Sequence, residues 1–166
     1  PGGRFVYASW TDLTGDLWLL GGYRNGGTKN DLWKYNITAN QWTWMKGPNT
    51  FNDPGNYGTK CVSANANVPP ARYENRARVR DGCGNFWNFG GARWSGWLND
   101  LWHYNVSTNQ WTWVSGDNIL NQPSVYGTKG ISAPANKPGA RFGNVAWIDK
   151  NGYIWVFGGW RNMGVN

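Results

Sequence analysis

The sequence contains few of the residues that build metal centres and hydrolytic active sites. Its 166 residues include one histidine, two cysteines and nine acidic residues. A zinc or copper site needs several histidine, cysteine or carboxylate ligands, and nucleophilic catalysis commonly needs a histidine beside a serine or cysteine. The single histidine, His103, has no such companions at a suitable spacing. We therefore expect a non-enzymatic chain without catalytic, metal-binding or cofactor-binding residues.

Long apolar runs and helical patterns are also absent. No run approaches the roughly 18 to 20 apolar residues that cross a bilayer, so we expect no membrane insertion. Leu, Ala, Glu and Lys do not recur with helical periodicity, whereas 24 Gly and 8 Pro favour short strands and tight turns. Fourteen Trp can supply a sizeable apolar core. The composition predicts an all-β protein.

Acidic residues are outnumbered by basic ones, which gives a net charge of +7. The 16 Lys and Arg are scattered over the turns instead of forming a stripe. Scattered charge is typical of an ordinary solvated surface, and nucleic-acid binding requires a concentrated basic face. We expect no nucleic-acid partner.

The sequence repeats itself at intervals of 68 or 69 residues. Arg4, Arg72 and Arg141 keep this spacing, and so do the Gly-Gly pairs at 21–22, 90–91 and 158–159. The segments NDLW, QWTW and YGTK each occur twice at the same interval. Such a period indicates a repeat architecture. We expect repeats at 1–68 and 69–137, and the first two strands of a third at 138–166.

Each repeat reads as four short strands separated by turn signals. In the first repeat we expect strands over residues 4–10, 15–22, 31–36 and 41–45, joined as an antiparallel meander. In the last of these, Trp42 and Trp44 alternate with Thr43, as in a strand with one apolar face.

The order of these features resembles the kelch repeat. An arginine is followed by an apolar segment ending in Gly-Gly, then by DLWKYN or DLWHYN, and then by a Trp after a short turn. The likeness covers the whole chain and is greatest to the long kelch repeats of secreted proteins related to the central domain of galactose oxidase. It implies a β-propeller segment of about two and a half four-stranded blades, with the first strand of each nearest the axis. We expect the remaining blades of a larger closed propeller to be supplied in cis or in trans.

The resemblance concerns the galactose oxidase scaffold and not its active site. No residues here match the Tyr and His copper ligands or the Cys-modified Tyr of that enzyme. It therefore implies a scaffold without copper in this stretch.

The two cysteines both lie around the second repeat. Cys61 stands where the next copy of the segment has Gly130, and Cys83 lies in the turn between the first two strands. We expect a disulfide between them, which would suit an oxidising, extracellular or cell-surface location; two independent free thiols are the alternative.

Asn36-Ile37-Thr38 and Asn105-Val106-Ser107 are equivalent N-glycosylation sequons. Asn36 and Asn105 are candidate glycan acceptors in a secreted protein. The alternative is that kelch turn chemistry produces this triplet by itself.

The first strand of the second repeat carries an alternating row of charges, Arg72, Glu74, Arg76, Arg78 and Arg80. The third repeat has Val145 and Trp147 where two of the arginines would fall, and one extra residue in the second repeat predicts a bulge. We expect either an arginine network partnered by Glu74 or an anion-binding spot near the axis.

Two sets of aspartates recur in the repeats. Asp12, Asp81 and Asp149 each precede a Gly by one to three residues and are expected to hold hairpin turns. Asp31 and Asp100 are expected to accept backbone hydrogen bonds where the third strand starts.

Strand parity places the longest connections on one face. The loops after the second and fourth strands of a meander emerge at the same end, here 23–30, 46–71, 92–99, 115–140 and the segment from 160. We call this end the long-loop face. The aromatic and guanidinium groups on it could bind a protein or stack on a glycan, and they are Tyr23, Arg24, Arg93, Trp94, Trp97, Trp160 and Arg161. The alternative is that the Trp rings tuck onto neighbouring repeats.

Three functions remain open from the sequence. The first is a non-catalytic extracellular module that recognises a protein or glycan or serves as surface scaffolding. The second is an accessory part of a copper-radical or other enzyme whose catalytic residues lie outside this chain. The third is a subunit of a polymeric assembly in which neighbouring molecules complete the exposed strand edge.

Overall fold

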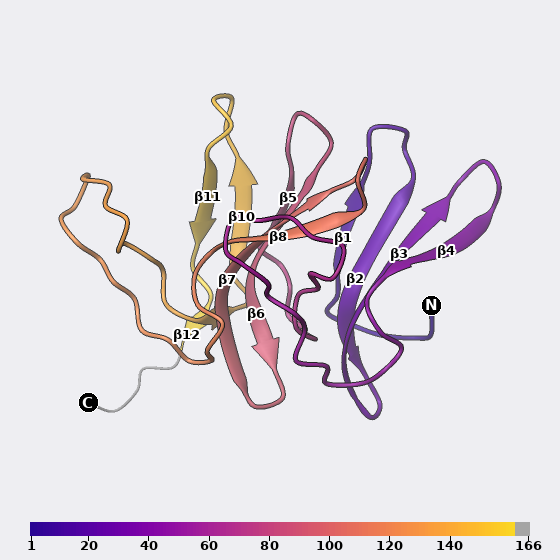
Figure 1. Cartoon of the computed structure of the whole chain (residues 1–166), viewed down its shortest axis with the longest axis horizontal. Coiled ribbons are helices and arrows are strands. Elements are labelled where there is room, and N and C mark those ends of the chain that lie inside the picture. Colours follow the sequence, from indigo (N-terminus) through magenta and orange to yellow (C-terminus); the bar gives the residue numbers. More distant parts are fainter. Residues whose placement is uncertain (162–166) are drawn as a thin grey trace.

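The computed structural model describes residues 1–161, and this part contains twelve β-strands and no helix. The all-β prediction is confirmed. Figure 1 shows strands standing side by side, with tight turns at both ends.

Two four-stranded antiparallel sheets contain most of the strands. The first has the order β1-β2-β3-β4 and the second β5-β6-β7-β8, so both are meanders. The strands of the first sheet are β1 (Ala8–Thr11), β2 (Leu17–Arg24), β3 (Gly27–Asn36) and β4 (Gln41–Lys46). Those of the second are β5 (Arg78–Arg80), β6 (Phe86–Arg93), β7 (Gly96–Asn105) and β8 (Gln110–Ser115).

The third repeat forms two short antiparallel pairs. Strand β10 (Val145–Ile148) pairs with β11 (Ile154–Phe157), and β9 (Arg141–Phe142) pairs with β12 (Trp160–Arg161). Strand β5 lies between β1 and β10 and contacts both, so the first strands of successive repeats are neighbours. Within residues 1–161 no sheet closes on itself.

A kink shortens the first strand of each repeat. Val6 has a φ of 53°, Glu74 54° and Gly143 69°. A β-branched residue such as Val6 rarely adopts this conformation. Because of the kink, Phe5 pairs with Tyr23 as an isolated bridge and β1 starts only at Ala8. The expected strand start at residue 4 is therefore wrong.

The extra residue of the second repeat shifts the expected alignment by one position. Ser9 pairs with Leu19, Arg78 with Asn88 and Ala146 with Val156. Leu19, Asn88 and Val156 each lie two residues before a Gly-Gly pair, so their partners Ser9, Arg78 and Ala146 are equivalent positions. The arginine row therefore corresponds to Ala146 and Ile148, and not to Val145 and Trp147 as expected.

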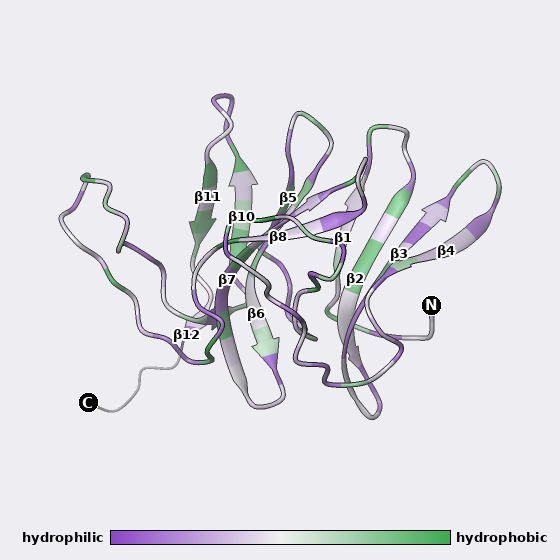
Figure 2. Cartoon of the chain, viewed as in Figure 1, coloured by the Kyte–Doolittle hydropathy of each residue, from purple (hydrophilic) through white to green (hydrophobic). Residues whose placement is uncertain are grey.

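The apolar core lies between the first two sheets. Trp18 and Leu20 from β2 pack with buried aromatic rings of the second sheet, among them Phe86, Tyr104 and Trp111. Trp10 of β1 stacks on Phe86 with the ring centroids 5.0 Å apart, and its indole N–H donates to the Val79 carbonyl at 3.1 Å. Figure 2 shows hydrophobic residues along β2 and also along β11, whose rings face solvent.

A buried ion pair anchors each complete repeat. The Arg72 guanidinium donates to both carboxylate oxygens of Asp100, at 2.8 and 2.6 Å, and to the Gly90 carbonyl at 2.9 Å. Arg4 binds Asp31 and the Gly21 carbonyl in the same way. The prediction that Asp31 and Asp100 accept backbone hydrogen bonds is wrong, because arginine and tryptophan side chains occupy their oxygens.

The turn aspartates are confirmed in their predicted role. One carboxylate oxygen of Asp12 accepts the backbone N–H groups of Thr14 and Asp16, and Asp81 and Asp149 hold their turns in the same way. The other oxygen of each accepts an indole N–H from the following strand, for example that of Trp18 at 2.8 Å from Asp12. These turns lie opposite the long-loop face (Figure 1).

Candidate functional site

The long-loop face is assembled by two equivalent asparagines. The Asn52 side-chain oxygen accepts the Thr28 backbone N–H at 2.9 Å, and the Asn52 backbone N–H donates to the Thr28 carbonyl at 2.8 Å. Asn121 binds the backbone of Trp97 with the same pair of bonds. Each asparagine comes from the connection after a fourth strand and holds the hairpin between the second and third strands. The parity argument for a common face is therefore confirmed. The expectation of long connections at 23–30 and 92–99 is wrong, because the strands continue to Arg24 and Arg93 and resume at Gly27 and Gly96, which leaves two-residue turns.

Glycine is required where these asparagines approach the hairpins. A side-chain carbon on Gly27 would lie 2.6 Å from the Asn52 amide nitrogen, and one on Gly96 would lie 2.7 Å from that of Asn121. The absence of a side chain lets each asparagine approach the hairpin backbone closely. It also leaves a shallow depression between the larger side chains nearby.

A pocket of about 250 Å³ lies on this face between the first and second repeats. Its lining residues are Tyr23, Gly26, Gly27, Asn52 and Trp94. The Tyr23 ring is half-buried and held by Phe5 and Tyr73, with centroids 5.1 and 5.8 Å away. Trp94 is 74% exposed. The pocket therefore has one fixed aromatic wall, one free aromatic wall and a glycine floor, which suits a flat ligand with an apolar face.

Two arginines border the pocket without entering it. Arg93 donates to the carbonyls of Asn52 and Asp53 at 3.2 and 3.3 Å and so ties the second repeat to the first. Burial lowers the pKa of Arg93, but the group remains a cation near neutral pH. Arg24 lies over the Phe51 ring with its guanidinium carbon 5.7 Å from the centroid. Both arginines support the loops.

The other three residues expected on this face lie toward the third repeat. Trp97 is half-buried and packs on Phe142 with centroids 5.6 Å apart, so its ring tucks onto a neighbouring repeat. Trp160 is 67% exposed, and it and Arg161 pair as β12 with β9. The structure therefore joins Tyr23, Arg93 and Trp94 around Asn52 but places Trp97, Trp160 and Arg161 elsewhere.

Sequence reasoning missed Asn52 and the two glycines of the pocket. A signal was present, because Asn52 and Asn121 keep the repeat interval. Their importance depends on a contact between segments 24 residues apart, which spacing within one repeat does not reveal.

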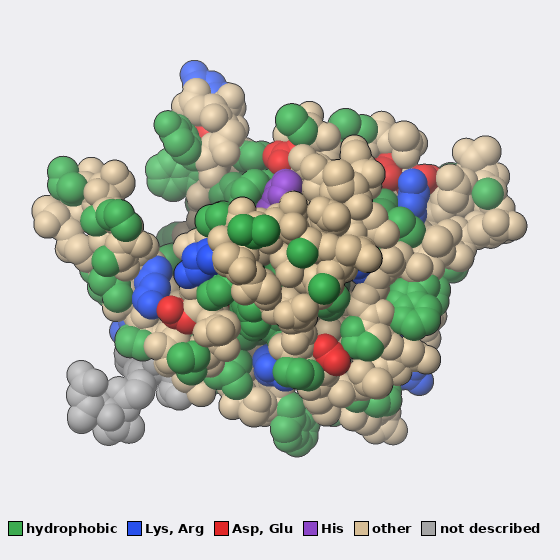
Figure 3. Space-filling model, in the orientation of Figure 1, with side chains coloured by type: hydrophobic (Ala, Val, Ile, Leu, Met, Phe, Trp, Pro, Cys, Tyr) green, Lys and Arg blue, Asp and Glu red, His purple; other side chains and the backbone are tan. Residues whose placement is uncertain are grey.

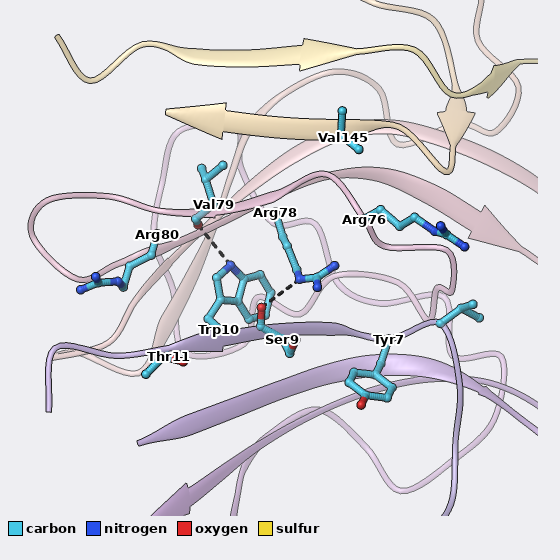
Figure 4. A pocket seen from close by; sticks show the side chains of 10 residues that line it. Tyr7, Ser9, Trp10, Thr11, Arg76, Arg78, Val79, Arg80 and Val145 are labelled. Carbon is cyan, nitrogen blue, oxygen red and sulfur yellow. Dashed lines mark hydrogen bonds between the residues drawn. The ribbon is translucent and has the colours of Figure 1, made fainter. Parts of the chain in front are cut away.

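A second cleft, of about 730 Å³, lies between the first strands of the repeats. Figure 4 shows Arg76, Arg78 and Arg80 along one side, with Tyr7, Ser9 and Thr11 on the other. Arg78 is half-buried and donates to the carbonyls of Ser9 and Asn75 at 2.9 and 3.2 Å, and burial lowers its pKa.

Only part of the expected arginine network forms. Glu74 pairs with Arg76 at 2.9 Å, and no carboxylate of residues 1–161 pairs with Arg78 or Arg80. A row of guanidinium groups with one carboxylate leaves a positive cleft that favours an anion.

The predicted disulfide does not form. Cys61 and Cys83 are both free and exposed. Cys61 lies on the outer side of β8, where its thiol is 3.5 Å from the Val114 carbonyl, whereas Cys83 lies in the β5–β6 turn. Strands are spaced about 4.8 Å apart, so β6 and β8 are separated by about 10 Å, beyond the reach of a disulfide.

The sequon asparagines take part in turn chemistry. The Asn36 side chain accepts the Ala39 backbone N–H at 2.7 Å and donates to Asp16 at 3.1 Å. The Asn105 oxygen accepts the Thr108 N–H at 2.9 Å. The two sites therefore differ, because only the Asn36 amide nitrogen, to which a glycan would be attached, already donates to a carboxylate. Their use as glycan acceptors stays a prediction.

His103 lies 3.9 Å from Asp81 and packs on Trp87, and burial lowers its pKa, so the imidazole is neutral at pH 7. Residues 1–161 contain no group of three or more His, Cys, Asp or Glu that could hold a metal ion. The same residues contain no helix long and apolar enough to span a membrane.

No protein-family model matches the sequence, and no curated protein is found to be similar to it.

Proposed function

We propose that this chain is a non-enzymatic, extracellular segment of a kelch-type β-propeller that recognises a glycan through its long-loop face. Two adjacent antiparallel meanders, whose first strands are neighbours, support the propeller part of the proposal. So does the Arg–Asp anchor found in both complete repeats. Each of these sheets would be one blade, and further blades would complete the ring.

The pocket between Tyr23 and Trp94 carries the proposed recognition. An exposed indole and a fixed phenol ring that line the same pocket can stack on the apolar face of a sugar, and loop backbone groups can bind its hydroxyls. A side chain of a protein partner is the second candidate occupant, because Trp and Tyr are the residues that most often dominate protein interfaces.

The test is binding of the chain to an array of neutral glycans, followed by calorimetric titration of any glycan retained. Trp94→Ala is expected to weaken binding about tenfold, the upper range for loss of one aromatic contact. Tyr153→Ala is the matched control, because Tyr153 is 66% exposed but lies in the β10–β11 turn at the opposite end. Equal affinity of Trp94→Ala and the unaltered chain would refute the site, and retention of a protein only would favour the second candidate.

The arginine cleft supports a second candidate function, the binding of an anionic ligand. Arg80 is exposed and pairs with no carboxylate of the described residues, so its charge is available. Titration with inorganic phosphate and tripolyphosphate is expected to show binding that weakens severalfold in Arg80→Gln and falls with added salt. Unchanged affinity in Arg80→Gln would exclude the cleft.

A further inference from the structure

The connection between the first and second sheets does more than join them. Its residues 57–67, here called the first latch, lie along the outer edge of β8 in the second sheet. The Cys61 backbone N–H donates to the Trp113 carbonyl at 2.8 Å, and the Asn67 amide donates to the Trp111 carbonyl at 3.1 Å. Ala64 forms an isolated β-bridge with Trp111. The first latch therefore covers an edge that would otherwise expose unpaired backbone groups.

Side chains of the first latch also reach the interior of the second sheet. The Tyr57 hydroxyl donates to Asp100 at 2.8 Å, and its ring packs on Trp102 and Trp113 at 5.1 and 5.0 Å. Lys60 lies over the Trp113 ring, 4.3 Å from its centroid, and donates to the Gly116 carbonyl at 2.8 Å. Beneath the first latch Trp111 is fully buried.

A second latch, residues 126–136, has the same internal structure but covers no strand edge within residues 1–161. Asn67 donates from its side chain to the Val62 carbonyl at 2.9 Å, and Asn136 donates to Ile131 at 3.0 Å. Its docking tyrosine, Tyr126, is 77% exposed, whereas Tyr57 is mostly buried. In Figure 1 this segment is the orange arm that projects from the sheets, and Figure 3 shows hydrophobic side chains on it. The latch conformation therefore forms without a docking edge.

The outer edge of β4 presents the same groups as β8, but no latch of residues 1–161 lies along it; only its end is contacted, where Asn109 donates to the Met45 carbonyl and Lys46 donates to Asn65. Trp42 and Trp44 are the counterparts of Trp111 and Trp113, and they are 44% and 49% exposed. The Trp44 indole donates to the Lys46 carbonyl at 2.9 Å, as that of Trp113 does to Ser115, so the two edges have the same local geometry. Asp31 accepts bonds from Arg4 and Trp33 but lacks the tyrosine hydroxyl that Asp100 receives.

We infer that the outer edge of β4 is a docking site for a further latch. Its occupant is an extended segment with Tyr-Gly-Thr-Lys and, seven residues after the lysine, an asparagine, supplied by a repeat outside residues 1–166. The tyrosine binds Asp31 and stacks on Trp44, the lysine lies over Trp44, and the asparagine binds the Trp42 carbonyl. This inference rests on the comparison of two edges and is independent of the proposed glycan site.

The second latch of another copy is a poorer occupant. A latch leads directly into the sheet that it covers, since Arg72 follows Asn67 by five residues and binds Asp100 in that sheet. The second latch is likewise followed by β9, β10 and β11. Docked on β4 in the observed geometry, these strands would overlap β1 and β2 of the receiving chain. A latch of a repeat that directly precedes residue 1 would lead into β1 itself and has no such conflict.

A peptide tests the docking site. The probe is a fluorescently labelled peptide of residues 122–138, which contains the latch pattern without a cysteine and is too short to bring the following strands. We expect saturable binding to the 166-residue chain by fluorescence anisotropy, with increased hydrogen-exchange protection confined to β4. A peptide carrying Tyr126→Ala and Asn136→Ala is expected to bind at least tenfold more weakly.

Variants of the 166-residue chain distinguish docking at β4 from nonspecific binding. Trp44→Ala is expected to weaken peptide binding at least tenfold, whereas Trp94→Ala, which alters an exposed Trp at another face, should leave it unchanged. Trp44 is half exposed, so the variant should fold, which its melting curve verifies. Absence of peptide binding, or protection elsewhere, overturns the inference. Concentration-dependent association of the chain that Trp44→Ala abolishes would identify a second copy as the occupant and overturn the assignment to a separate repeat.

Discussion

The first and second repeats have nearly the same outer strand and differ in what covers it. Trp111 of the second repeat is fully buried under the first latch, whereas Trp42 of the first repeat is 44% exposed. The same contrast reaches the anchor, because Asp100 has a tyrosine partner and Asp31 has none. The difference shows that the segment preceding the second sheet covers the outer strand of that sheet. Without such a segment, the tryptophans of the outer strand stay partly exposed to solvent.

Replacing Trp111 or its counterpart Trp42 with alanine should give the largest difference in stability between the two repeats. Trp111→Ala removes a fully buried ring and is expected to lower the free energy of unfolding by about 3 to 5 kcal/mol. Trp42→Ala removes a half-exposed ring and should cost about 1 kcal/mol. Urea unfolding followed by circular dichroism measures both. Equal losses would mean that the first latch contributes little to burial.

The arginine anchors should differ by a smaller amount. Arg72→Met leaves the Asp100 carboxylate enclosed without its cation, a loss of about 3 to 5 kcal/mol. Arg4→Met is expected to cost about 2 kcal/mol, because the Lys29 cation lies near Asp31 and would offset part of the lost charge of Arg4. The same unfolding measurement applies. A greater loss for Arg4→Met would contradict the role assigned to the latch.

The hydroxyl groups of Tyr57 and Tyr126 should contribute differently to stability, because only Tyr57 is docked. Tyr57→Phe deletes one hydrogen bond to a charged group but also removes a hydroxyl group that is costly to bury. We expect the free energy of unfolding to fall by about 1 kcal/mol. Tyr126→Phe alters an exposed side chain and should change stability by less than about 0.5 kcal/mol. Identical stabilities would show that the Tyr57 bond to Asp100 is dispensable.

Acid should weaken the first repeat through Asp31. Burial would raise the pKa of Asp31, but hydrogen bonds from Arg4 and Trp33 outweigh it, so the pKa lies below its ordinary value. A depressed pKa adds stability above about pH 4, which is lost as the pH falls through the folded-state value. Melting temperatures between pH 6 and pH 2 should therefore fall less steeply in Asp31→Asn. Parallel curves would exclude a contribution from this group.

Trp94→Ala should have the smallest effect on stability, within about 0.5 kcal/mol, because the ring is exposed. A much larger loss in the melting curve would mean that Trp94 supports the loops, and reduced glycan binding could then not be assigned to a direct contact.

The sequence predicts the strands well and the contacts between distant segments poorly. Regular spacing of Gly-Gly, Asp-Leu-Trp and Gln-Trp-Thr-Trp sets the meander, and turn aspartates such as Asp12 are identified by local chemistry alone. Strand parity also places the long loops at one end. All of these features depend on neighbours along the chain or on the period.

What the sequence does not give depends on contacts across more than 20 residues. Arg72 and Asp100 each recur with the period, but their pairing joins positions 28 residues apart. The recurring Tyr-Gly-Thr-Lys marked the latches without revealing the strand that they cover. The disulfide prediction failed for a related reason, since two cysteines that lie around the same repeat are not thereby close to each other.

The order of the latch and its strand has a consequence for synthesis on the ribosome. Cys61 of the first latch precedes Val114, whose carbonyl its thiol meets, by 53 residues. At 5 to 20 residues per second, a growing chain would hold the latch without its docking edge for roughly 3 to 10 seconds. During that interval Tyr57 and its neighbours are available to the edge of any strand already made, including β4. The interval is a window in which the nascent chain must avoid premature pairing.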